Sequence, residues 1–324
     1  MINFEYSRTS SVKAALDVLA KNPGASFIAG GTNLVDLMKK GVATPQRLVD
    51  INNLPLKQIS IDAKGLTIGA LALNSDVAEN EKVKKNYPLL VQAINAGASA
   101  QLRNMATIGG NIMQRTRCTY FYDTTLPCNK RKPGSGCGAL KGYNRMHAIF
   151  GASDKCIAVQ PSDMSVALAA LDATVMVSSS KGERKIPFTD FHRLPGDIPE
   201  KDNNLQPGEL ITAIHVPINS FNKNHYLKIR DRASYAFALV SVAVALKVNG
   251  NIIQSARLAM GGVAHKPWRL KQAEEMLTGS AIHDLSFAKL TDNIMQDAKT
   301  YEHNAFKIKL GKAAIAEAIN KALQ

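Results

Sequence analysis

Four cysteines are the side chains in this sequence best suited to redox or metal chemistry, and they fall close together. They are spaced C-x9-C-x8-C-x18-C along the chain, at Cys118, Cys128, Cys137 and Cys156. Cysteines can pair as disulfides, bind zinc or hold an iron–sulfur cluster. The short C-x2-C runs that zinc and iron–sulfur sites usually contain are absent, so the spacing alone leaves these three possibilities open.

The charge around the cysteines favours the iron–sulfur cluster. Residues 101–156 contain nine Lys and Arg against two Asp, a net charge of +7 that is half of the +14 of the whole chain. A four-iron cluster held by four thiolates is a net anion, and a positive region would stabilise it. The same charge would suit a nucleic-acid binder, but no recognised binding motif accompanies it, so no nucleic-acid partner is expected.

Two Gly-Gly stretches are candidates for holding a phosphate-bearing ligand. FIAGGTNL, residues 27–34, places its glycines between an expected strand and a helix start, where bare N–H groups and the helix dipole favour a diphosphate. QLRNMATIGGNI, residues 101–112, could clasp the ligand from the other side through N–H groups, Thr107 and Asn111. Each stretch could also be an ordinary turn, but together they favour a nucleotide-type ligand.

Three single residues have both a functional and a structural interpretation. Asp163 could accept hydrogen bonds from a ligand, or Ser162 and Asp163 could cap the helix that follows. Lys228 could lie against an anionic ring or phosphate, or at the surface, and His265 after a Gly-Gly turn is predicted to be structural. No Ser-His-Asp, Cys-His, paired-carboxylate or H-E-x-x-H arrangement occurs at a recognisable spacing, so a cofactor would have to supply any redox chemistry.

The elements that position these residues form a mixed pattern of helices and strands. Helical periodicity predicts helices over 10–24, 31–41, 87–100, 271–279 and 309–323, with Thr32 or Asn33 capping the second. Short apolar runs predict strands at 26–30, 47–51, 57–61, 66–71 and 209–217, and residues 162–177 read as a helix followed by a strand. Residues 237–263 read as a hairpin with a type I′ turn at Asn249-Gly250.

The length and composition predict two domains. An irregular, cysteine-rich insertion covers about 112–158 of the first domain, 1–218, and a polar link near 218–224 leads to a second domain, 222–324, made of a small sheet and helices. No run reaches the roughly 18 apolar residues that a membrane helix needs, so no membrane partner is expected. The first residues lack the pattern of a secretory signal, so the chain is expected to carry no export signal of its own.

Five motifs in order resemble a known family. FIAGGTNLVDLM, QLRNMATIGGNIMQ, PSDM, GELITAIHVP and KIRDRASYAFALVSVA resemble the FAD-binding medium subunit of the xanthine dehydrogenase and carbon monoxide dehydrogenase family of molybdenum hydroxylases. The resemblance implies an α+β fold: an FAD-binding domain of the vanillyl-alcohol-oxidase type, with subdomains of about 1–55 and 56–218, followed by a C-terminal domain of antiparallel sheet plus helices. The cysteine insertion is similar to the one that holds an extra [4Fe–4S] cluster in a periplasmic aldehyde oxidoreductase of this family.

The resemblance also implies the site residues. The cluster would be ligated by Cys118, Cys128, Cys137 and Cys156. FAD would be bound by Ser26, Phe27, Ile28, Ala29, Gly30, Gly31, Thr32, Asn33, Leu34, Thr107, Gly110, Asn111, Asp163, Ile211 and Lys228. No residue of this chain would be catalytic, because substrate oxidation would occur in a partner.

The function implied by the resemblance is electron transfer within a heterotrimer. A large molybdenum-cofactor subunit would oxidise an aldehyde with water to a carboxylic acid, and a small [2Fe–2S] subunit would pass electrons through FAD of this chain to an external acceptor. A related xanthine or CO dehydrogenase-type hydroxylase, a stand-alone FAD oxidase and a zinc- or disulfide-stapled interaction subunit without redox activity are the alternatives. Location in the periplasm by co-export with a partner is expected, with the cytoplasm as the alternative.

Overall fold

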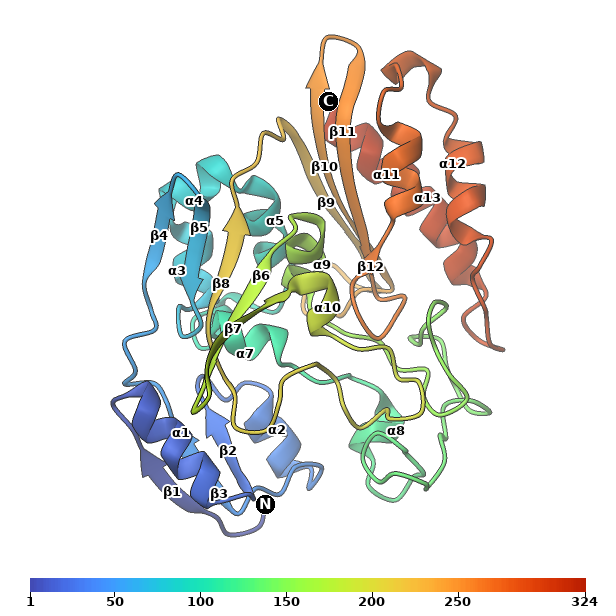
Figure 1. The fold of residues 1–324 in the computed structure, drawn as a ribbon. Coiled ribbons are helices and arrows are strands. Elements are labelled where there is room, and N and C mark those ends of the chain that lie inside the picture. The colour runs from blue at the N-terminus through green and yellow to red at the C-terminus, as the bar shows by residue number, and fades with distance from the viewer.

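Three sheets follow one another along the chain and define the architecture (Figure 1). The computed structural model describes residues 1–324. The sheets have the strand orders β1-β3-β2, β4-β5-β8-β6-β7 and β12-β11-β10-β9. This combination of sheets and covering helices confirms the α+β class predicted from the sequence. None of the helices combines the length and the apolar character needed to cross a membrane.

The first sheet is small and parallel, and it carries the first Gly-Gly loop. Its strands are β1 (Glu5–Arg8), β3 (Arg47–Asp50) and β2 (Ala25–Ile28), with α1 (Val12–Lys21) and α2 (Leu34–Lys39) connecting them. Helix α1 begins at Val12, within the predicted range 10–24, because the Ser11 hydroxyl accepts a hydrogen bond from the Ala14 N–H. The predicted side-chain cap of α2 is wrong: Asn33 occupies the cap position, but its side chain makes no capping bond.

The second sheet is antiparallel and has five strands. It consists of β4 (Ile59–Asp62), β5 (Gly65–Gly69), β8 (Leu210–Pro217), β6 (Thr174–Ser179) and β7 (Gly182–Pro187). The helices of this part are α3 (Asn74–Glu79), α4 (Glu81–Asn86), α5 (Pro88–Ala96), α6 (Ala100–Arg103), α7 (Ile108–Ile112), α9 (Asp163–Ala170) and α10 (Phe188–Phe191). Every residue of α9 is buried, because it packs between this part and the third sheet.

The third sheet and its helices form the C-terminal part. The strands are β9 (Lys223–Ile229), β10 (Val240–Asn249), β11 (Ile252–Gly261) and β12 (Trp268–Arg269). The helices are α11 (Lys271–Leu277), the 3-10 turn Ile282–Asp284, α12 (Phe287–Met295) and α13 (Phe306–Leu323). Helix α13 packs along β9 and β10 and buries the apolar face that its periodicity predicted.

The predicted hairpin of β10 and β11 is present, but its predicted turn is wrong by one residue. Asn249 pairs with Ile252, so the two turn residues are Gly250 and Asn251. Gly250 has a φ of 57°, whereas Asn251 is absent from the residues with positive φ, so the turn lacks the two positive φ values of type I′.

The cysteine region between α7 and α9 is irregular, as predicted, and contains only one short helix, α8 (Thr119–Tyr122). It lies between α2 and the C-terminal part of the protein and contacts both (Figure 1). Ile149 and Phe150 belong to the buried core of the C-terminal part, and Phe150 stacks on Trp268 with ring centroids 5.1 Å apart. At its other end, Phe121 packs against Leu37 of α2.

Candidate cofactor-binding and cysteine site

The first Gly-Gly loop joins β2 to α2 and packs tightly against a second segment of the chain. A Cβ atom on Gly30 would lie 1.8 Å from the carbonyl oxygen of Met105, so only glycine allows this approach. Gly31 adopts a φ of 70°, in the left-handed region that glycine tolerates without strain. The loop containing Gly30 is thereby fixed against the segment that leads into α7.

Backbone N–H groups of this loop are free to bind a ligand. The N–H groups of Gly30, Gly31, Thr32 and Asn33 donate no hydrogen bond within the protein. Four consecutive free donors at the start of a helix provide N–H groups and a partial positive charge, which suit a diphosphate. The Asn33 side chain is used differently, because its Oδ1 accepts a hydrogen bond from the Arg115 N–H at 2.8 Å.

The second Gly-Gly stretch differs from the expectation, because it forms α7 and its N–H groups already have acceptors. The Gly109 N–H donates to the Ala70 carbonyl at 2.8 Å. The Gly110 N–H donates to the hydroxyl of Thr107, which caps α7. The Asn111 N–H donates to the Thr107 carbonyl at 2.8 Å. The second stretch therefore presents side chains to a ligand rather than a second set of free N–H groups.

Asp163 and Lys228 form a buried ion pair. Lys228 Nζ lies 2.8 Å from Asp163 Oδ2, and the two side chains are 5% and 6% exposed. The Tyr226 hydroxyl donates to Asp163 Oδ1 at 2.8 Å, and Lys228 Nζ also donates to the Ala96 carbonyl at 3.0 Å. Lys228 is thus not a surface residue, because it is buried and Asp163 compensates its charge.

Hydrogen bonds and packing connect these predicted cofactor residues. The Ser162 hydroxyl lies 2.6 Å from Asn111 Oδ1, which joins the start of α9 and its Asp163 to α7. Ile211 lies on β8, next to α7, with its side chain in the main core. The structure therefore brings the first Gly-Gly loop, α7 and the Asp163–Lys228 pair into one connected region, with Ile211 buried behind it.

The four cysteines converge although 38 positions separate the first from the last. All four are free thiols, and all four line one small cavity. Cys128 and Cys137 face each other in an isolated antiparallel bridge, which closes the loop between them. No group of three or more His, Cys, Asp or Glu side chains is arranged to hold a single metal ion. The thiols thus surround a common space without meeting at one point.

Burial makes two of the four thiols weakly acidic. It raises the pKa of Cys118 to about 12 and that of Cys156 to about 11, where Lys130 partly opposes the effect. The charges of neighbouring cysteines raise both pKa values further, as expected for thiols that share one space. A metal or cluster that binds here would have to displace the thiol protons.

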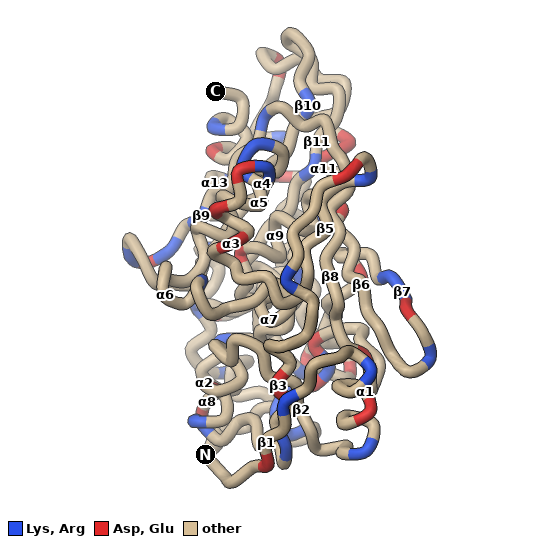
Figure 2. Tube along the Cα trace, turned by 90° about the vertical axis from the view of Figure 1, so that its left-hand side faces the viewer, with Lys and Arg blue, Asp and Glu red and all other residues tan.

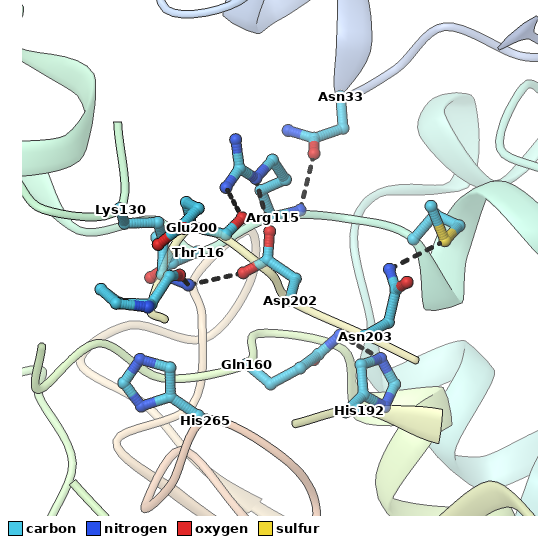
Figure 3. Close-up of polar contacts among 12 residues, drawn as sticks. Asn33, Arg115, Thr116, Lys130, Gln160, His192, Glu200, Asp202, Asn203 and His265 are labelled. Carbon is cyan, nitrogen blue, oxygen red and sulfur yellow. Dashed lines mark hydrogen bonds and ion pairs between the residues drawn. The ribbon is translucent and has the colours of Figure 1, made fainter. Parts of the chain in front are cut away.

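The basic residues near the cysteines are partly neutralised. Asp202 lies between Arg115 and Lys130, with contacts of 2.5 and 2.6 Å, as Figure 3 shows. Arg117 pairs with Asp36 at 3.4 Å. Along the side of the molecule drawn in Figure 2, blue and red segments are interspersed. The positive charge that the sequence suggested around the cysteines is therefore smaller than the count of Lys and Arg implies.

A cavity of about 280 Å³ connects the cysteine region with the predicted cofactor residues. Cys118 and His147 contribute to its wall from the cysteine region, and Ser162 and Asp163 contribute from the start of α9. Phe237, ahead of β10, adds an aromatic side chain. One space is thus bordered by a cysteine and by a predicted FAD-binding residue.

Sequence reasoning missed two contacts of the cysteines. His147 Nε2 lies 3.1 Å from Cys118 Sγ, and His265 Nε2 lies 3.2 Å from Cys156 Sγ. Burial lowers the pKa of His147 to about 4 and lowers that of His265 as well. The contact of His265 spans 109 positions, so no local spacing could have indicated it.

Two family models together match nearly the whole chain. Residues 2–219 match the model described as the FAD binding domain in molybdopterin dehydrogenase. Residues 225–322 match the model described as the CO dehydrogenase flavoprotein C-terminal domain.

Similar proteins extend over the same length. The aldehyde oxidoreductase FAD-binding subunit PaoB of Escherichia coli is 48% identical over 323 residues, which cover 98% of each chain. The glyceraldehyde dehydrogenase medium chain of Sulfolobus acidocaldarius is 33% identical over 282 residues, covering 87% of this chain and 83% of the relative. Among solved structures, quinoline 2-oxidoreductase of Pseudomonas putida 86 aligns with a TM-score of 0.77 and 25% identity, over 99% of this chain and 97% of the other.

Proposed function

Because the chain belongs to the family of FAD-binding subunits of molybdopterin dehydrogenases, we propose that it is the FAD and [4Fe–4S] electron-transfer subunit of an aldehyde oxidoreductase. FAD binding and membership of the oxidoreductase subunits follow from the family. The aldehyde substrate is inferred from two relatives whose names are those of an aldehyde oxidoreductase subunit and a glyceraldehyde dehydrogenase medium chain.

The first Gly-Gly loop is the observation that best supports the FAD assignment. The free N–H groups of residues 30–33 are suited to the oxygens of the FAD diphosphate, and the contact of Gly30 with Met105 holds the loop in place. Bound FAD supplies the exchange of electrons with a donor and an external acceptor. The chain's share is to bind and orient it, with Thr107, Asn111 and the Asp163–Lys228 pair bordering the same region.

The arrangement of the thiols fits an iron–sulfur cluster. A [4Fe–4S] cluster binds one thiolate at each iron, so its ligands surround a space instead of meeting at one ion. Four free thiols, two of them buried and two half-buried, line one small cavity and suit that arrangement. Cys118, Cys128, Cys137 and Cys156 would be the ligands, and the surrounding protein would keep water from them.

Partners complete the proposed assembly. Relatives of this chain are named as a subunit or a medium chain, which indicates complexes with other chains. We propose a large subunit with the molybdenum cofactor, where aldehyde and water become a carboxylic acid, and a small [2Fe–2S] subunit that delivers electrons to this chain. Co-export to the periplasm stays a prediction from the resemblance, and cell fractionation of the tagged complex tests it.

The test is an anaerobic absorption spectrum of the complex purified with its co-expressed partners, with iron, molybdenum, zinc and released flavin quantified on the same sample. We expect FAD together with four more irons per chain than the [2Fe–2S] subunit accounts for, and loss of this iron in Cys128→Ser. Ser135→Ala is the matched control, because it removes a hydroxyl that contacts the Cys128 N–H while keeping all four thiols.

Each outcome has a separate meaning. FAD without additional iron would refute the cluster and leave the flavin subunit intact. Zinc in place of iron would assign the cysteines a structural role. A complex without flavin would refute the proposed function as a whole.

A further inference from the structure

Two buried histidines contact two of the four cysteines, and the proposed function assigns neither of them a role. His147 is 5% exposed and His265 is 8% exposed. They come from different parts of the chain, because His147 belongs to the cysteine region and His265 follows β11 in the C-terminal part. Each places its Nε2 at hydrogen-bonding distance from a sulfur, Cys118 in one case and Cys156 in the other.

The surroundings of the two rings indicate which nitrogen carries the hydrogen when the cysteines ligate a metal. The Nδ1 atoms of His147 and His265 are buried without any hydrogen-bond partner, whereas the Nε2 atoms contact sulfur. A thiol S–H could donate to Nε2, but a cysteine that ligates a metal has lost this hydrogen. The contact is then a hydrogen bond only if Nε2 carries the hydrogen and the sulfur accepts it. A thiolate is a much better acceptor than a thiol, so these hydrogen bonds are strongest when the cysteines ligate a metal.

Both histidines are held in place from the backbone side. Lys307 Nζ donates to the carbonyl of His147 at 2.9 Å, and Lys307 is fully buried. His265 follows two carbonyls that bond to the cysteine region: Val263 accepts from the Ile149 N–H at 2.9 Å, and Ala264 accepts from the Gln160 N–H at 3.0 Å. The backbone next to each ring is therefore held without help from its cysteine.

We propose that His147 and His265 are positioning residues that donate N–H···S hydrogen bonds to Cys118 and Cys156 and thereby raise the reduction potential of the cluster. This inference rests on the proposed [4Fe–4S] cluster. Hydrogen bonds to ligand sulfurs stabilise the added negative charge of the reduced cluster, which makes reduction easier. The effect would be uneven, because neither histidine contacts Cys128 or Cys137.

The experiment compares two substitutions at each position in the purified complex. Leucine removes the donor, whereas glutamine keeps an N–H donor at a similar reach. The cluster potential is measured by a redox titration followed by electron paramagnetic resonance, and iron and FAD are quantified on the same samples. His192→Gln is the matched control, because His192 is also buried but bonds to the Ile112 carbonyl and to no cysteine.

We expect His147→Leu and His265→Leu to retain iron and to shift the cluster potential to more negative values, with additive shifts in the double variant. The glutamine variants should return towards the wild-type potential, and His192→Gln should leave it unchanged. A wild-type potential in both leucine variants with full iron would overturn the inference.

If a leucine variant loses its iron, its cluster potential cannot be measured, and the glutamine variant at the same position then tests the inference. Recovery of iron and of the wild-type potential with glutamine supports the hydrogen bond. Continued loss of iron with glutamine, in a complex that keeps its FAD, overturns it, because a donor at that position then does not suffice. Absence of additional iron in the wild-type complex would refute the cluster itself, and it is detected before any variant is made.

Discussion

Replacement of Gly30 by alanine is expected to open the first Gly-Gly loop and weaken FAD binding. A Cβ atom there would lie 1.8 Å from the Met105 carbonyl oxygen, and real Cβ atoms keep at least 3.0 Å. The loop and the Met105 segment must therefore separate by about 1.2 Å, since a backbone oxygen cannot rotate away as a side chain can. Overpacking of this kind costs about 1–3 kcal/mol. If the whole cost falls on the bound state, FAD affinity drops about 5- to 150-fold.

The assay is a titration of the FAD-depleted protein with FAD, followed by flavin fluorescence, together with the flavin content of the purified complex. Gly24→Ala is the matched control, because its Cβ would meet only the end of the flexible Gln46 side chain, at 2.8 Å. Gly24→Ala should bind FAD like the wild type. Wild-type affinity and flavin content in Gly30→Ala would refute the reasoning that this close contact shapes the FAD site.

Three other predictions concern stability. Lys228→Met leaves Asp163 buried without its cation and should lower the free energy of unfolding by about 3–5 kcal/mol in urea titrations, and the double variant with Asp163→Asn should recover part of it. Burial lowers the pKa of Lys307 from 10.5 to about 7, so the unfolded chain binds more protons between these values and stability rises with pH. From pH 7 to 8.5 the free energy of unfolding of the wild type should rise by about 1–2 kcal/mol relative to that of Lys307→Met, and an equal pH dependence of the two proteins would contradict this. Cys128→Ser should speed limited proteolysis within residues 112–158, and an unchanged digestion pattern would count against a bracing role of the cluster.

The regular elements could be predicted because local chemistry determines them. The helix of Val12–Lys21 has its apolar stripe and its Ser11 cap in the sequence itself. The cap of α2 was wrong for a non-local reason, since the Asn33 side chain bonds to the Arg115 N–H across 82 positions. The turn predicted at Asn249-Gly250 lies one residue further along the chain. The strand pairing sets the position of the turn, and this pairing depends on the whole sheet.

The sequence identified the segments of the candidate site, but not which N–H groups are free or how much positive charge surrounds the cysteines. The motif resemblance identified the Gly-Gly loop, and the structure adds that its N–H groups are free whereas those of residues 108–111 are not. That difference depends on the packing of α7 against Ala70 and cannot be read from two similar Gly-Gly strings. The count of Lys and Arg in residues 101–156 overestimated the positive charge near the cysteines. Asp202, which is distant in the sequence, pairs with both Arg115 and Lys130.

The contact of Lys307 with the His147 carbonyl has a consequence for biosynthesis. The two residues are 160 positions apart. At translation rates of about 5–20 residues per second, the cysteine region would wait about 8–32 s for this lysine to be made. During that interval the thiols would be accessible to oxidants and to the wrong metals. Delivery of iron is therefore expected to follow synthesis of α13, and cysteine alkylation of stalled nascent chains would measure how long the thiols stay reactive.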